Sequence, residues 1–144
     1  MYSSIVLEHF FHPRHVGVLP SPHGTGVVGT PAKGDYVEMF ISVAEGRITE
    51  AMVRCFTCPV AVAACDMTAQ MVQQMTLEEA LGLSPYEVAQ ALGGVPDEKM
   101  SRCHLAISAL RAALNDFLSR NARASPQGKE ISPKELNSTK EELQ

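Results

Sequence analysis

Two thiols stand three residues apart in the segment Cys55-Phe56-Thr57-Cys58-Pro59, where an expected strand passes into an expected helix. Two cysteines at this spacing can bind one metal ion or close a disulfide. Pro59 suits the first position of a helix, so we expect Cys58 at a helix N-terminus, where the helix dipole and free N–H groups favour a thiolate. One such pair is a weak zinc signal, and a redox dithiol is more typical of a parallel βαβ unit. Thiol redox or sulfur relay therefore stays a minor alternative to metal binding.

A second pair of soft ligands, Cys103 and His104, opens another expected helix directly after Arg102. Thiolate and imidazole suit zinc or iron–sulfur chemistry better than magnesium or calcium. Two helix N-termini that each offer such a ligand could converge on one ion or cluster. Cys65 lies two turns beyond Cys58 on the apolar side of its helix, so we expect it to be a small core residue.

The elements that must position these residues follow from the hydrophobic pattern. We expect a short helix over residues 5–11, an extended Gly- and Pro-rich loop over 16–35, and a hairpin of strands 36–43 and 48–55. Helices are then expected over 59–75, after the capping-box sequences at Thr76 and Ser84, and from about 101 to 120. Asp66 is expected on a solvated helix face, with an approach to the site as the alternative, and His9, His12 and His15 in capping or partner contacts.

The composition is that of an ordinary globular domain and does not indicate nucleic-acid binding. The chain has 144 residues, a formal net charge of −4 and 45% hydrophobic residues, which fits one domain without a basic patch. No signal-peptide pattern or membrane-length apolar run is apparent. We therefore expect a cytoplasmic protein, or an organellar one if a transit peptide has been removed. Residues 1–124 form the expected domain, and residues 125–144 form a polar tail that we expect to be disordered.

Four motifs, in order and with matching spacing, carry a resemblance to a known family. They are the segment from His9 to Gly17 with its Pro13-Arg14, the loop Pro31-Ala32-Lys33-Gly34-Asp35, Cys58 before an Ala-rich helix, and Cys103 near the start of a helix. Over about residues 1–120 the chain resembles the U-type iron–sulfur cluster assembly scaffolds, the IscU and NifU N-terminal domain group. The resemblance implies an α+β fold of SufE/NifU type, with a small antiparallel sheet packed against several helices.

The resemblance also implies a function and a set of partners. Such a protein is a scaffold or carrier rather than an enzyme, holds an iron–sulfur cluster transiently, and accepts sulfur from a cysteine desulfurase. A frataxin-like protein and a chaperone are further implied partners, with no nucleic acid and no membrane. A homo-oligomer is left open. The alternative is a divergent paralogue that binds zinc, or that regulates or bridges partners without assembling clusters.

Residue by residue, the resemblance implies Asp35, Cys58 and Cys103 as ligands of iron or cluster, with Cys103 as the persulfide acceptor. Cys55 and His104 are additional candidate ligands. Two departures stand out, because Lys33 occupies the position of the family's first cysteine, and an ungapped match places Arg102 in the third position with Cys103 one residue late. An ammonium group cannot ligate a metal unless it is deprotonated, but it stabilises neighbouring thiolates.

Overall fold

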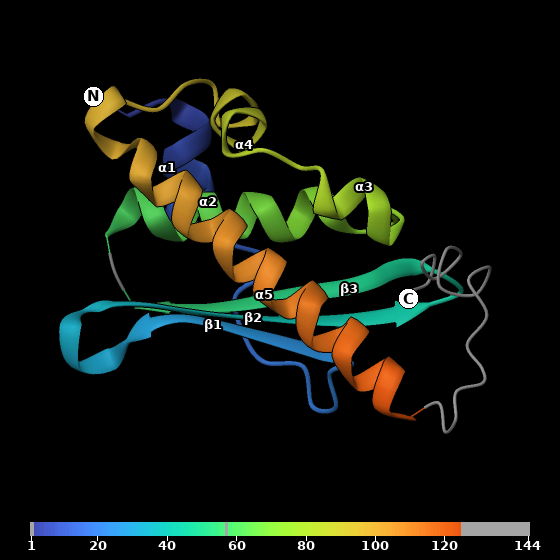
Figure 1. Cartoon of the computed structure of the whole chain (residues 1–144). Coiled ribbons are helices and arrows are strands. Elements are labelled where there is room, and N and C mark those ends of the chain that lie inside the picture. The colour runs from blue at the N-terminus through green and yellow to red at the C-terminus, as the bar shows by residue number, and fades with distance from the viewer. Residues whose placement is uncertain (1, 57, 125–144) are drawn as a thin grey trace.

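The protein is a three-stranded antiparallel sheet covered on one face by helices (Figure 1). The computed structural model describes residues 2–56 and 58–124. Its elements in chain order are helix α1 (Ser4–Phe11), strand β1 (Gly24–Thr30), the 3₁₀ turn η1 (Pro31–Lys33), β2 (Asp35–Ala44), β3 (Arg47–Phe56), α2 (Pro59–Val72), α3 (Leu77–Leu81), α4 (Pro85–Ala91), the 3₁₀ turn η2 (Asp97–Lys99) and α5 (Met100–Ala124).

This arrangement confirms the predicted α+β fold with its antiparallel sheet. The predicted hairpin is the pair β2–β3, and the two capping boxes at Thr76 and Ser84 are both formed, with reciprocal hydrogen bonds to Glu79 and Glu87. The last helix begins at Met100 and reaches Ala124. The predicted tail lies outside the described residues, so the domain boundary stays a prediction.

The prediction of an extended loop over residues 16–35 is wrong, because residues 24–30 form the edge strand β1. Glycine is a poor strand former, so the segment carries little local strand signal. The glycines have another role: a Cβ at Gly26 would lie 2.3 Å from the Ala109 carbonyl oxygen, and one at Gly24 would lie 2.4 Å from that of Ala113. The absence of side chains lets α5 lie directly on β1.

The core lies between the sheet and helices α2 and α5, which cross its inner face (Figure 1). Alternate residues of β2, namely Val37, Met39 and Ile41, are fully buried against these helices, as expected for a strand with one covered face. Helix α1 packs on α2, and α4 packs on α5 and α2, further from the sheet. None of the described helices has the length and apolar character needed to cross a membrane.

Candidate functional site

The candidate site lies between the end of β3 and the start of α2, at the end of the sheet that also contains the β1–β2 connection (Figure 1). Cys58 is the N-cap residue of α2, with extended backbone, and Pro59 follows at the first helical position. The N–H groups of the first turn have no partners within the helix, so this end of α2 favours negative charge on the nearby Cys58 thiol, although the thiol makes no capping hydrogen bond. The predicted place of Cys58 at a helix N-terminus is therefore confirmed.

Arg102 forms a hydrogen bond with the Cys58 sulfur. Its Nε–H donates to Sγ at 3.2 Å, and its Nη1 donates to the Ser101 hydroxyl at 2.8 Å. Partial burial opposes ionisation of Cys58, but the Arg102 hydrogen bond, the backbone N–H groups of Ala61 and Val60, and the Arg102 charge together lower the pKa of Cys58. Cys58 is thus a half-buried thiol whose pKa lies below its ordinary value.

Cys103 lies in a different environment from its neighbour Arg102. Its side chain is 0% exposed and belongs to the hydrophobic core, and burial raises the pKa of Cys103 to about 11. Successive residues on an α-helix point about 100° apart, so these two neighbouring side chains face different directions. The structure places Arg102 on Cys58 and Cys103 in the core. The roles of Cys103 as ligand and persulfide acceptor stay predictions.

In the native protein, the thiol of Cys58 should therefore react with an alkylating reagent and the thiol of Cys103 should not. Near neutral pH we expect iodoacetamide to modify Cys58 while Cys103 stays unmodified, because a pKa of about 11 leaves only about 10⁻⁴ of Cys103 as thiolate at pH 7. Peptide mass spectrometry after timed labelling measures both rates. Labelling in denaturant is the control, since it should expose both cysteines equally. Native labelling of Cys103 as fast as Cys58 would contradict its burial.

The other two cysteines face each other inside the fold. Cys65 is fully buried, as predicted, and a hydrogen bond with the Cys55 thiol, burial, and the nearby groups Cys55, Cys103 and Asp66 raise the pKa of Cys65 well above its ordinary value. Cys55 is half-buried on β3 opposite Val37 and packs against the core. Both are free thiols. Cys55 is therefore engaged with Cys65, which disfavours it as a replacement for the missing ligand.

The remaining predicted site residues are His104, Lys33 and Asp35. His104 is exposed and meets the ring of Tyr86 edge-on, with 5.8 Å between centroids, and Lys33 is exposed in η1. Asp35 begins β2, but its side chain lies outside the described part of the structure. Among the side chains that are described, no three from His, Cys, Asp and Glu are grouped closely enough to hold a metal ion.

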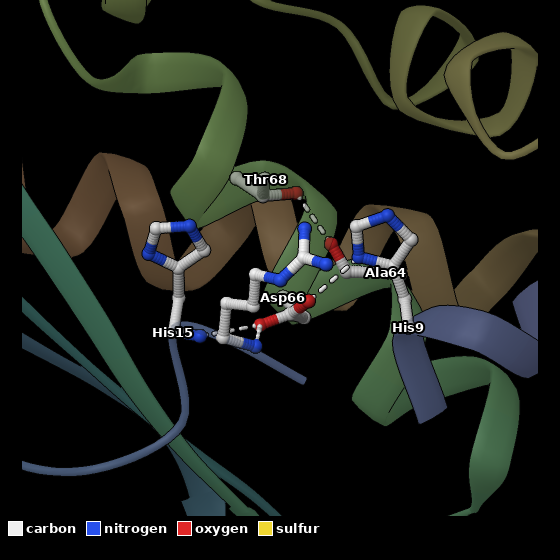
Figure 2. A network of polar contacts seen from close by, with 6 residues as sticks. His9, His15, Ala64, Asp66 and Thr68 are labelled. Carbon is white, nitrogen blue, oxygen red and sulfur yellow. Dashed lines mark hydrogen bonds and ion pairs between the residues drawn. The ribbon is translucent and has the colours of Figure 1, made fainter. Parts of the chain in front are cut away.

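The buried carboxylate of Asp66 binds the N-terminal segment (Figure 2). The sequence predicts it on a solvated helix face. Asp66 is 0% exposed; its Oδ2 accepts from Nδ1 of His9 at 2.6 Å, and its Oδ1 accepts from the backbone N–H groups of Arg14 at 3.0 Å and His15 at 2.7 Å. The prediction of a solvated Asp66 is wrong. Its position among Ala64, Cys65, Met67 and Ala69 was the signal available, since a charge inside an apolar stretch needs buried partners.

Asp66 supports the sheet as well as the helices. The His15 carbonyl accepts from the N–H of Val53 at 2.8 Å, and the N–H of Gly17 donates to the Val53 carbonyl at 2.8 Å. Residues 15–17 therefore extend the sheet along the free edge of β3, and Asp66 holds them there. Through β3, the same contacts support the strand that leads to Cys58.

Comparisons with known proteins identify the family of this chain. The family model of the NifU-like N-terminal domain matches residues 1–124. The iron–sulfur cluster assembly scaffold protein IscU 1 of Archaeoglobus fulgidus is 40% identical over 123 residues, covering 85% of this chain and 80% of that protein. The scaffold protein IscU of Aquifex aeolicus is 33% identical over 130 residues, covering 89% and 83%.

A solved structure shows the same fold. The N-terminal part of a nitrogen-fixing NifU-like protein from Brucella abortus superimposes with a TM-score of 0.65 over 82% of this chain and 94% of that one. The sequences of the two are 15% identical, so this likeness concerns the arrangement of helices and strands.

Proposed function

Because the chain belongs to the family of NifU-like N-terminal domains, we propose that it acts in iron–sulfur cluster assembly and accepts sulfur from a cysteine desulfurase at Cys58. The observation that carries this proposal is the contact between Cys58 and Arg102, with Nε 3.2 Å from Sγ. A thiolate is the nucleophile in sulfur exchange. Cys58 is the cysteine whose pKa is lowered, whereas the pKa values of Cys65 and Cys103 are raised.

The proposed step needs no oxidant. The Cys58 thiolate attacks the terminal sulfur of a persulfide on the desulfurase, and a bond forms between Cys58 Sγ and that sulfur. The sulfur–sulfur bond of the donor breaks, and the donor cysteine leaves as a thiolate. One persulfide is thus exchanged for another, with charge and oxidation level conserved.

Asp35 and Cys103 stay the candidates for holding iron or cluster beside Cys58. Asp35 begins β2 at the same end of the sheet. For Cys103 to contribute, the first turn of α5 would have to rotate its buried thiol out of the core. We therefore assign the sulfur-accepting role, which the resemblance gave to Cys103, to Cys58.

A divergent paralogue that does not assemble clusters is the second candidate. It is favoured by the cationic residues Lys33 and Arg102 at two positions where the family resemblance expects cysteines, since neither side chain ligates a metal in its charged form. Zinc bound by the purified protein would support this second candidate.

The test is anaerobic incubation with a cysteine desulfurase and L-cysteine. Mass spectrometry of the protein and its peptides then measures the sulfur added to each cysteine. We expect one added sulfur atom on the peptide that contains Cys58, its loss in Cys58→Ser, and its retention in the matched variant Cys103→Ser. Sulfur that stays on the Cys58→Ser protein and disappears from Cys103→Ser would overturn the assignment. The same variants are then supplied with ferrous iron, and visible absorbance reports whether a cluster forms.

A further inference from the structure

The guanidinium group of Arg102 is fixed against the Cys58 sulfur. It bridges two elements, because Arg102 belongs to the first turns of α5 while Cys58 caps α2. One of its nitrogens donates to Cys58 Sγ at 3.2 Å and another donates to Ser101 Oγ at 2.8 Å. Two hydrogen bonds from one planar group restrict its orientation. The guanidinium group of Arg102 therefore has a defined position in the site.

A metal ion bound to Cys58 on the side that faces Arg102 would compete with this group for the same space. A thiolate-bound zinc or iron lies only about 2.3 Å from the sulfur, so an ion on the side of Sγ that faces Arg102 would be in contact with the guanidinium. Both carry positive charge and repel each other. Arginine offers five donors and no acceptor, so it cannot become a ligand by turning.

Sulfur transfer, unlike metal binding, is favoured by a positive charge beside Cys58. Both the attacking thiolate and the persulfide anion that it becomes carry negative charge on sulfur, and a charge-assisted N–H donor stabilises both. Arg102 therefore favours sulfur as the cargo of Cys58 and disfavours a metal ion.

We propose that Arg102 determines the cargo of Cys58, by donating a hydrogen bond to its sulfur during sulfur transfer and by occupying the place of a metal ion. This inference rests on the proposed function of Cys58 and specifies it. Arg102 acts through Cys58, so it is a specificity-determining residue.

Two measurements test the role of Arg102 without a desulfurase. The first is the rate of iodoacetamide alkylation of Cys58 near neutral pH in wild type, Arg102→Ala and Arg102→Lys. We expect a decrease of about threefold to tenfold in Arg102→Ala, because a smaller thiolate fraction is partly offset by greater nucleophilicity. Arg102→Lys should recover part of the rate. Arg120→Ala, on the same helix near Pro22, should match the wild type.

The second measurement is anaerobic titration with cobalt(II), read by its thiolate charge-transfer absorbance. We expect no band in the wild type and about one bound cobalt in Arg102→Cys. Arg102→Ser serves as a second variant, smaller and uncharged, which should bind cobalt more weakly through Cys58. A wild-type protein that binds cobalt as strongly as Arg102→Cys, or an unchanged alkylation rate in Arg102→Ala, would overturn the inference.

The outcomes separate this inference from the proposed function. If sulfur from the desulfurase reaches Cys58 of the wild type, but Arg102→Ala leaves the alkylation rate unchanged and Arg102→Cys binds no more cobalt than the wild type, only the role of Arg102 is overturned. Absence of sulfur on Cys58, combined with the expected cobalt and alkylation results, overturns only the desulfurase as the sulfur source.

Discussion

Gly26→Ala is expected to destabilise the fold by about 3 kcal/mol or more, near the upper limit for adding one methyl group to a packed interior. The new Cβ would lie 2.3 Å from the Ala109 carbonyl oxygen, 2.4 Å from the Ala113 nitrogen and 2.8 Å from the Ala112 Cβ. All three belong to α5, and two are backbone atoms, so no flexible side chain can move aside. Relief requires α5 to move away from β1. For a domain of this size we expect a fall in Tm of about 10 °C.

Gly82→Ala is the matched control for this prediction. A Cβ at Gly82 would lie 3.6 Å from the Glu79 carbonyl oxygen, an ordinary contact, and its φ of −89° suits alanine. Thermal and urea unfolding of both variants should show a loss of stability in Gly26→Ala alone. Equal stability of the two variants would show that α5 does not lie on β1 as described.

Asp66→Ala is expected to cost about 3–5 kcal/mol, because it leaves the partners of a buried charge without an acceptor. The groups affected are the His9 ring and the backbone N–H groups of Arg14 and His15. Asp66→Asn keeps the shape and one acceptor oxygen, so its effect should be smaller. Urea unfolding measures the free energy of unfolding, and amide exchange of Val53 reports whether residues 15–17 detach from β3.

The control is Glu50→Ala, an exposed carboxylate on β3. It should change the free energy of unfolding by less than about 0.5 kcal/mol. His9→Ala adds a second comparison: its effect and that of Asp66→Ala should not be additive, because the two side chains share one interaction. A cost for Asp66→Ala close to that of Glu50→Ala would mean that the buried network contributes nothing to stability.

Features decided by neighbouring residues were predictable from the sequence. The capping boxes at Thr76 and Ser84 and the turn Glu45-Gly46, with φ of 54° and 77°, depend on contacts within a few residues. The position of Cys58 before Pro59 likewise follows from the local rule for helix N-termini. The motif spacing also led to the family, because residue order is preserved along the chain.

Three features were decided only by the tertiary structure, each for a physical reason that no local pattern contains. Strand β1 exists because its glycines let α5 approach, and that contact joins residues more than 80 positions apart. Asp66 is buried because donors from residues 9–15 reach it. Arg102 and Cys103 are neighbours in sequence, and only the rotation of α5 about its axis, which its packing against the sheet and α2 sets, turns Arg102 to Cys58 and Cys103 into the core.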